Sequence, residues 1–262
     1  MEIQKLLGAG CDHCSDGVPL WHSPPVPVML RNNEVHIWRA SLNLPVPQVR
    51  SLQHTLTAEE LKRAQRYYFM KDRENFIVAR GLLREILGSY LKMLPGQLRF
   101  TYNDYGKPCL AGQLGGETLR FNVSHSHGLA LYAVTRGRAV GIDVERIRPD
   151  LAEADITERF FSPREVAALR ALPIDMQPEA FFRCWTRKEA YIKAKGTGLS
   201  IPLDTFDVSP APMEPAVLLN VNGDPEETSR WSLQELSVDS GYAAALAVEG
   251  HDWQLKCWQW MV

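Results

Sequence analysis

The sequence predicts an α+β fold of two pseudo-symmetric subdomains, each a small sheet packed with helices, with an active-site cleft between them. Two capping boxes, in which Ser or Thr is followed three residues later by Glu, begin at Thr57 and Ser162, 105 residues apart. Two strand segments, LRFTYN and DTFDVS, align on Phe100 and Phe206, 106 residues apart. The strand segment VHIWRASL of the first half likewise has a counterpart, GIDVERI, in the second. This repeated order of strand, two helices and strands is what a duplicated unit would give.

Composition limits the class of protein. The chain has 262 residues, 45% of them hydrophobic, which can bury a sizeable core in one large or two small domains. A net charge of −2 and a pI near 6.4 argue against a nucleic-acid-binding protein, which would be basic. The five cysteines are scattered and odd in number, which favours a reducing compartment. No apolar run is long enough to span a membrane, and the first residues lack the basic-then-apolar pattern of a signal peptide. We therefore expect a cytoplasmic protein that binds neither nucleic acid nor membrane.

Residues 1–33 are punctuated by glycine and proline, and we expect an irregular leader there. The predicted subdomains are then residues 34–126 and 127–262. Cys11, His13, Cys14 and His22 are metal-ligand types, but a structural zinc site needs four ligands, usually as two spaced pairs. No clean second pair follows CDHC, so zinc is not predicted.

In the first half, alternation predicts a strand over 35–42, followed by a proline-marked loop. The capping box at Thr57 predicts a helix to about Phe69, and a second helix follows over 71–92. The two helices carry eight cations: Lys62, Arg63, Arg66, Lys71, Arg73, Arg80, Arg84 and Lys92. Such charges are either a solvated helical face or a docking surface for an anion.

Further strands are predicted over 98–102 and 119–124, the second leading to His125. Neighbouring strand residues point to opposite faces, so Ser124 and His125 do not form a nucleophile–base pair. Segments 129–135 and 139–145 predict a hairpin. Asp143 and Glu145 are two apart and point to the same side, where their charges repel unless a cation lies between them. Oxygen ligands at this spacing suit Mg²⁺, although a strand end that has reached solvent would also carry charges.

The capping box at Ser162 predicts a helix to about Leu172, a second helix covers about 179–195, and strands near 205–209, 230–238, 242–248 and 253–260 follow. On the second helix, Lys188 falls within an apolar face, with Glu189 at its edge and Lys193 one turn further. A buried lysine needs an anion, unless its stem packs while its ammonium reaches water. Cations from the first half and carboxylates from the second, meeting across one cleft, describe a phosphate-ester site.

Five segments, in order, resemble the blocks of 4′-phosphopantetheinyl transferases of the Sfp type. They are FIVARGLLR at 76–84, YGKP at 105–108, FNVSHS at 121–126, GIDVE at 141–145 and WTRKEAYIK at 185–193. The resemblance covers roughly residues 35–260. It implies transfer of the 4′-phosphopantetheine arm of coenzyme A to a serine of an acyl or peptidyl carrier protein, with release of 3′,5′-ADP.

The resemblance also implies roles for individual residues. Mg²⁺ would be held by Asp143, Glu145 and Glu189, and Glu189 would also accept the serine proton, directly or through water. Coenzyme A and its phosphates would be bound by Ser124, His125, Lys188 and Lys193 from one side, and by Arg63 and Lys107 from the other. The family often carries a basic residue where this chain has Asn75, a contact for which Arg73 or Arg80 is the candidate substitute.

Two other functions are weighed against this transferase. Another Mg²⁺-dependent phosphoryl transferase would use the same cleft, but the sequence has no GxxxxGK[ST] loop. A non-catalytic coenzyme A or carrier-protein binding module would be expected to lack one metal carboxylate, yet all three are present. One chain supplies both sides of the cleft, so a monomer is expected. Arg159, Phe160 and Phe161 are either a docking edge for an acidic carrier protein or part of the core.

Overall fold

The computed structural model describes residues 14–15, 18–19, 21–112, 119–149, 154–210 and 214–261. Residues 1–13, 16–17 and 20 of the predicted irregular leader, with Cys11 and His13, lie outside the described residues, and residues 21–33 contain no helix or extended strand pairing beyond a single bridge at His22. The helices are α1 (Val46–Gln53), α2 (Ala58–Ala64), α3 (Met70–Leu91), α4 (Ala154–Phe160), α5 (Pro163–Arg170), α6 (Gln177–Lys195) and α7 (Pro225–Ser229). The strands are β1 (Cys14–Ser15), β2 (Val18–Pro19), β3 (Glu34–Ser41), β4 (Phe100–Tyr102), β5 (Pro108–Leu110), β6 (Leu119–Ser126), β7 (Leu129–Arg136), β8 (Val140–Arg146), β9 (Phe206–Val208), β10 (Leu218–Val221), β11 (Trp231–Glu235), β12 (Tyr242–Glu249) and β13 (Gln254–Gln259).

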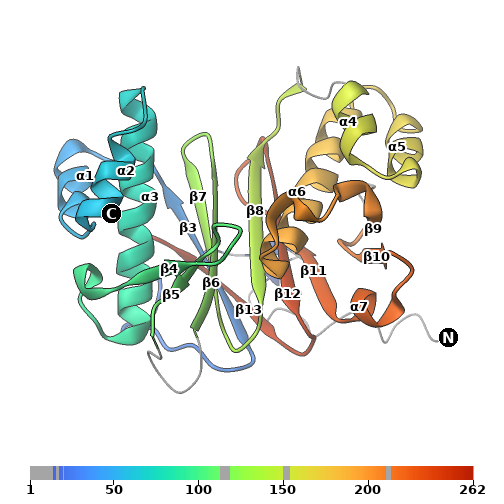
Figure 1. Cartoon of the computed structure of the whole chain (residues 1–262). Helices are drawn as coiled ribbons and strands as arrows, with labels where there is room; N and C mark the ends of the chain where they lie inside the picture. Colours follow the sequence, from blue (N-terminus) through green and yellow to red (C-terminus); the bar gives the residue numbers. More distant parts are fainter. Residues whose placement is uncertain are drawn as a thin grey trace.

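Two sheets stand side by side in the middle of the molecule, with α3 on the outer face of one and α6 on the outer face of the other (Figure 1). The first sheet has the strand order β13-β3-β7-β6, and the second has the order β11-β12-β8. Strand β13 pairs parallel to β3 and the other pairs in these sheets are antiparallel. The predicted α+β class, with two subdomains that each combine a small sheet and helices, is confirmed.

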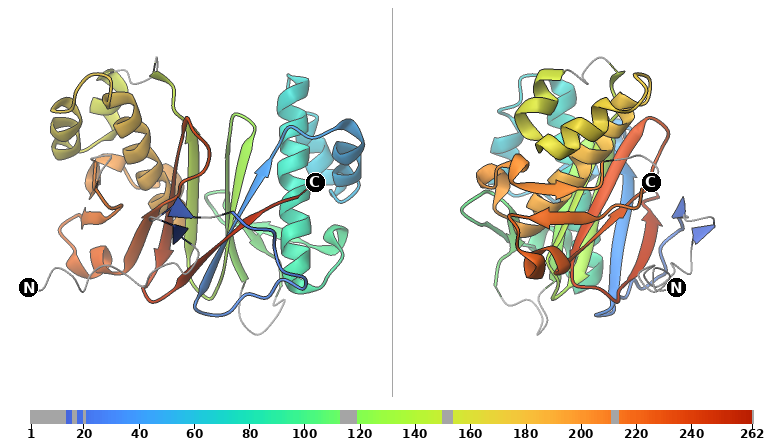
Figure 2. Two further views of the ribbon diagram at one scale, coloured as in Figure 1. Left: turned by 180° about the vertical axis from the view of Figure 1, so that it is seen from behind. Right: turned by 90° about the vertical axis from the view of Figure 1, so that its right-hand side faces the viewer.

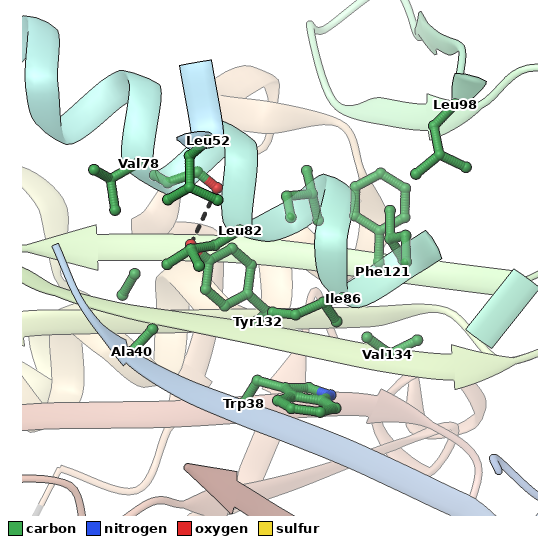
Figure 3. Packing of buried hydrophobic residues seen from close by; sticks show 14 of the residues in the cluster. Trp38, Ala40, Leu52, Val78, Leu82, Ile86, Leu98, Phe121, Tyr132 and Val134 are labelled. Atoms are coloured by element: carbon green, nitrogen blue, oxygen red, sulfur yellow. Dashed lines mark hydrogen bonds between the residues drawn. The ribbon is translucent and has the colours of Figure 1, made fainter. Parts of the chain in front are cut away.

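Three apolar clusters hold these layers together. One lies between α3 and the first sheet and includes Trp38 and Tyr132, whose hydroxyl donates to the carbonyl of Ala79 at 3.1 Å (Figure 3). A second lies between α6 and the second sheet, and a third fills the space between the two sheets. Apolar side chains thus occupy both faces of the central strands, whose burial supplies the main stabilisation. None of the described helices is long and apolar enough to cross a membrane.

The predicted hairpin of β7 and β8 is wrong. Strand β7 pairs with β3 and β6, whereas β8 pairs with β12, so the short turn after β7 carries the chain from one sheet to the other. Both edges of β7 are already occupied by strands of the first sheet, which leaves no edge for β8. The predicted division after residue 126 separates the paired strands β6 and β7, and it assigns β13 to the second half although β13 lies in the first sheet. Chain order and spatial grouping therefore differ at these two strands.

Helix boundaries follow their end signals. Both predicted capping boxes are present: Thr57 caps α2 and Ser162 caps α5, each with its glutamate bonded back to the cap backbone. Helix α2 ends at Ala64 rather than near Phe69, because residues 65–69 are exposed and bury too little apolar surface to support a further turn. The expected proline-marked loop contains α1, with Pro45 at its N-cap and Pro47 in its first turn.

The long helix of each half is anchored by the capping-box glutamate of that half. In the first, the Glu60 carboxylate binds the guanidinium groups of Arg80 at 2.5 Å and Arg84 at 2.8 Å. Arg84 also donates to the carbonyls of Pro95 and Leu98 and lies over the Phe100 ring. A buried charge is stable only when it is paired and hydrogen-bonded in this way.

The second half repeats the arrangement with other residues. Glu165 binds the ammonium of Lys188 at 2.8 Å, and neither side chain is exposed to solvent. Lys188 also donates to the carbonyls of Leu203 and Phe206 and lies over the Phe206 ring. The alignment on Phe100 and Phe206 thus corresponds to a repeated structural contact.

Strands β6 and β8 are edge strands of different sheets, yet they are joined by what we call the β6–β8 side-chain ladder. Three alternate side chains of β6 accept hydrogen bonds from backbone N–H groups of β8. The pairs are Asn122 Oδ1 with Ile142 N at 2.8 Å, Ser124 Oγ with Val144 N at 3.3 Å, and Ser126 Oγ with Arg146 N at 3.2 Å. This polar joint brings the FNVSHS and GIDVE segments together.

Candidate active site

A pocket of about 380 Å³ opens where β6, β8 and α6 meet. Six of the nine predicted site residues line it: Ser124, His125, Asp143, Glu145, Glu189 and Lys193. Val123 and Trp185 complete its wall. The structure therefore brings together residues from both halves of the chain, but the cation that meets the carboxylates is Lys193 of the second half, and the expected basic residues of the first half, Arg63 and Lys107, do not line the pocket.

The approach of α6 to β8 depends on Gly141. A Cβ atom at this position would lie 2.1 Å from the carbonyl oxygen of Ala190 and 2.3 Å from the nitrogen of Ala194. Only glycine allows the helix backbone to rest so close to the strand. This close contact brings Glu189 and Lys193 to the same pocket as Asp143.

Asp143 is the most buried carboxylate of the pocket, with 2% of its surface exposed. Its Oδ1 accepts a hydrogen bond from Ser124 Oγ at 2.8 Å and one from Lys193 Nζ at 2.5 Å. Its Oδ2 is buried and has no hydrogen-bond partner in the described part of the chain. A buried carboxylate oxygen without a donor is costly, and a bound cation would satisfy it.

The other two carboxylates have raised pKa values. Burial, followed by the charge of Asp143, raises the pKa of Glu145, although Ser126 Oγ donates to Glu145 at 2.8 Å. Burial, followed by the charges of Asp143 and Glu145, raises the pKa of Glu189 to about 7, with Lys193 acting in the opposite direction. Three carboxylates thus share one ammonium, and a divalent cation would relieve their repulsion.

His125 lies exposed in the pocket wall. Partial burial of its ring, together with the nearby charge of Lys193, lowers its pKa. Lys193 Nζ also donates to Ser124 Oγ at 3.1 Å, so Ser124 and Asp143 together hold the ammonium in place. The neutral imidazole and the remaining N–H of the Lys193 ammonium offer donors for an anionic ligand, whereas the Ser124 hydroxyl already donates to Asp143.

Lys188 does not line this pocket, so that part of the prediction is wrong. Its side chain is completely buried and its ammonium is bound by Glu165 and two backbone carbonyls. The anion that its buried position required is therefore a structural partner on α5, not a ligand.

Lys107 is also placed differently from the prediction. Its ammonium donates to the backbone carbonyls of Val140, Lys193 and Ala194 at 3.1, 2.5 and 3.3 Å. Lys107 thereby holds the C-terminal turn of α6, where the carbonyl dipoles favour a cation. All three of its N–H groups are used, which leaves no donor for a coenzyme A phosphate. Burial lowers the pKa of Lys107 to about 8.

The predicted basic surface of the first half is smaller than expected. Arg80 and Arg84 are buried and bound to Glu60, so Arg80 cannot take the place of a basic residue at Asn75. Arg63 is exposed, with its guanidinium over the Phe76 ring, and does not line the pocket. Arg73 donates to the carbonyl of Tyr67.

The docking edge at Arg159–Phe161 is not supported. Phe161 is only 2% exposed and stacks on Phe181, with ring centroids 5.2 Å apart. Phe160 packs edge-to-face against Trp185. The alternative, that these phenylalanines belong to the core, is confirmed for Phe161.

Sequence reasoning missed the ladder residues Asn122 and Ser126. The signal was available, because Asn122, Ser124 and Ser126 alternate along one strand and therefore share a face. What the sequence does not contain is the neighbour on that face, since β8 belongs to another sheet.

Two family models match the two parts of the chain that form the pocket. The family model described as "4′-phosphopantetheinyl transferase superfamily" matches residues 139–247, and that described as "4′-phosphopantetheinyl transferase, N-terminal" matches residues 38–136. The two matched segments meet at the turn between β7 and β8.

Curated relatives cover most of the chain. It is 43% identical to the 4′-phosphopantetheinyl transferase HetI of Nostoc sp. over 92% of this chain and 98% of the relative. It is 29% identical to the 4′-phosphopantetheinyl transferase Sfp of Bacillus subtilis over 75% of this chain and 84% of the relative. Among solved structures, the Chronobacterium ammoniagenes ACPS–CoA complex matches at 23% identity and a TM-score of 0.33, over 44% of this chain and 97% of that chain. A likeness this remote supports no argument about the site.

Proposed function

Because the chain belongs to the 4′-phosphopantetheinyl transferase superfamily, we propose that it transfers the 4′-phosphopantetheine arm of coenzyme A to a serine of an acyl or peptidyl carrier protein. The reaction would depend on Mg²⁺ and release 3′,5′-ADP. The observation that carries the proposal is the pocket in which Asp143, Glu145 and Glu189 converge with Lys193 at the junction of the two halves.

The residues present fit a magnesium ion. Asp143 Oδ2 is buried without a donor in the described part of the chain, and the pKa values of Glu145 and Glu189 are raised first by burial and then by neighbouring carboxylates, so a cation would stabilise their charged forms. Within the described residues, no group of three or more His, Cys, Asp or Glu side chains is close enough to hold a metal ion without other ligands. Mg²⁺ commonly keeps several waters and takes substrate phosphate oxygens beside one or two carboxylates. When bound, the ion would stabilise charge that grows on the phosphates.

The chain's own groups would then perform positioning and proton transfer. The carrier serine Oγ attacks the phosphorus that bears the pantetheine arm, and the bond from that phosphorus to the oxygen of 3′,5′-ADP breaks. Lys193 and His125 would bind the phosphates, and Ser124 orients Lys193. Glu189, with a pKa of about 7, would accept the serine proton. A carboxylate bound to a metal is a weaker base, so the two roles of Glu189 compete.

We also propose a cytoplasmic monomer. One chain supplies both the β6 wall and the α6 wall of the pocket, and Cys109, Cys184 and Cys257 are free thiols, which supports a reducing compartment. We keep the division at residues 126–127 as a description of the order of elements along the chain, not of which strands share a sheet.

The test is intact-mass spectrometry of an apo carrier domain incubated with this protein, coenzyme A and Mg²⁺. We expect a gain of about 340 Da, the mass of the arm, and its loss when Mg²⁺ is chelated. A carrier that gains a bare phosphate would indicate another phosphoryl transferase. Coenzyme A binding without any gain would indicate a binding module, and either outcome would overturn the proposal.

A further inference from the structure

The turn between α2 and α3 exposes several bulky apolar side chains in succession. Tyr68 is 91% exposed, and Phe69 and Met70 are each 65% exposed. We call Tyr67–Met70 the aromatic turn. Among the described residues, it is the only stretch of consecutive large apolar side chains left to solvent. Contiguous exposed apolar surface of this kind usually marks an interaction site.

Cations flank the aromatic turn in the sequence. In the described part of the chain, none of the following forms an ion pair: Lys62, Arg63, Arg66, Lys71 and Arg73. The same segment has three exposed carboxylates, Glu59, Asp72 and Glu74, so positive charge is in excess although the whole chain has a net charge of −2. An apolar centre within a cationic rim suits an acidic protein surface.

The aromatic turn lies near the β6–β7 turn, which closely follows the pocket residue His125. Burial, followed by the charges of Arg148, Arg146 and Lys71, lowers the pKa of His127, so Lys71, which follows the aromatic turn directly, is close enough to act on the β6–β7 turn. His127 follows Ser126, which donates to Glu145 in the pocket. The start of α3, the β6–β7 turn and the end of β8 all lie at the upper end of the molecule in Figure 1.

Size then decides which part of a carrier protein can enter. A pocket of about 380 Å³ accepts a side chain and the phosphates of a cofactor but not a folded domain. The body of a protein that delivers a serine to Glu189 must therefore rest on the surface outside the pocket, and the aromatic turn is exposed at the same end of the molecule as the ends of β6 and β8.

We propose that the aromatic turn, with Lys71 beside it, is the docking surface for the carrier protein, and that the carrier face which meets it is acidic around an apolar ridge. The proposal rests on the transferase function proposed above. It assigns Tyr68 and Phe69 as apolar anchors and Lys71 as the cation that orients the partner.

The test compares Tyr68→Ser/Phe69→Ser and Lys71→Glu with Ile174→Ser, a control at a side chain that is 84% exposed elsewhere. An apo carrier domain and coenzyme A are each titrated at saturation of the other, and binding of the apo carrier domain is measured without coenzyme A. We expect KM and Kd for the carrier to rise about tenfold or more in both test variants. The kcat and the KM for coenzyme A should stay within about twofold, as should every constant of the control. The effect of Lys71→Glu should shrink at high salt.

Each other outcome overturns the assignment. Unchanged carrier constants would show that the aromatic turn is not the docking surface, and a raised KM for coenzyme A would assign it to the cofactor. A wild-type dimer that Tyr68→Ser/Phe69→Ser dissociates would assign it to a second copy of this chain. If the wild type transfers nothing, the proposed function fails, and carrier binding then tests docking by itself: loss of binding in the variants supports docking, and unchanged or absent binding refutes it.

Discussion

In both halves of the molecule, a capping-box glutamate binds a buried cation of the long helix, and that cation lies over a phenylalanine that begins the next strand. Glu60, Arg84 and Phe100 form this support in the first half, and Glu165, Lys188 and Phe206 form it in the second. The supports are alike, so the difference between the halves lies in the strand that faces the helix.

On β3, the residues that face α3 fill the interface. Trp38 and His36 are buried, and both bind the Tyr90 hydroxyl at 2.8 Å. On β8, Asp143 follows Trp38 by 105 residues, the same separation as Glu165 from Glu60. There Gly141 and two carboxylates leave a polar pocket. In the first half, aromatic rings fill the interface between α3 and β3, whereas in the second half the interface between α6 and β8 contains the polar pocket.

The largest effect expected from this comparison concerns the facing strand. Asp143→Ala should lower the rate of transfer by about a hundredfold or more while the fold survives. The substitution removes both the buried carboxylate and the group that holds the Lys193 ammonium in place. The matched change in the first half, Trp38→Phe, should leave transfer within about twofold. Steady-state rates and titration of Mn²⁺ into the free protein would measure both. Normal turnover of Asp143→Ala at limiting Mg²⁺ would end the metal assignment.

The long helices offer a second matched pair. Glu189 follows Lys188 in α6 as Glu85 follows Arg84 in α3, and burial raises the pKa of both carboxyls. Glu189→Gln keeps the shape and removes the charge, so we expect about a hundredfold loss of transfer or more with intact folding. Glu85→Gln should change transfer by less than about twofold. Transfer by Glu189→Gln within a few-fold of the wild type would return Glu189 to the role of a helix-surface residue.

A third change tests the shared support. Lys188→Met leaves the Glu165 carboxylate buried without its cation, which should lower the free energy of unfolding by about 3–5 kcal/mol. Lys188→Met/Glu165→Gln should recover part of that loss. Urea unfolding would measure the free energies, and transfer per folded molecule should stay near the wild-type rate. A variant of full stability that no longer binds coenzyme A would restore Lys188 to the site.

The pH dependence of the melting temperature should report the raised pKa of Glu189 at the α6–β8 interface. The folded-state pKa of Glu189 is about 7, well above that of an unfolded glutamate, so the folded protein binds the extra proton between these values and loses stability as pH rises through them. In chelator, wild type should therefore lose more Tm than Glu189→Gln between pH 5 and pH 8, by a few degrees. Parallel Tm curves for the two proteins would contradict the raised pKa.

The smallest effect concerns the β6–β8 side-chain ladder. Ser126→Ala removes the donor to Glu145, and we expect Mn²⁺ affinity to fall by about three- to tenfold, less than for a direct ligand. In a Glu145→Ala background the same change should have no further effect on affinity. An equal loss in both backgrounds would mean that Ser126 supports only the β8 backbone.

Local patterns predicted much of this molecule. The sequence predicted both capping boxes, the shared face of Asp143 and Glu145, and the long helices. Each of these features depends on residues that are close in the sequence. The partners of the buried cations were not predicted, because tertiary packing alone brings them together. Lys188 meets Glu165, Lys107 meets carbonyls of α6, and Arg80 meets Glu60. A buried lysine shows that an anion is needed, but the sequence does not show which one.

The parallel pairing of β13 with β3 also bears on how the protein is made. Figure 2 shows β13 beside β3, although Gln259 and Arg39, which are hydrogen-bonded, are 220 residues apart. A ribosome therefore exposes β3 with one bare edge throughout the synthesis of the second half, and a bare edge invites pairing with other chains. Contacts this distant also slow folding. The first sheet is thus completed only after the strands of the second have been synthesised. The two halves therefore cannot finish folding independently, although they repeat the same order of elements.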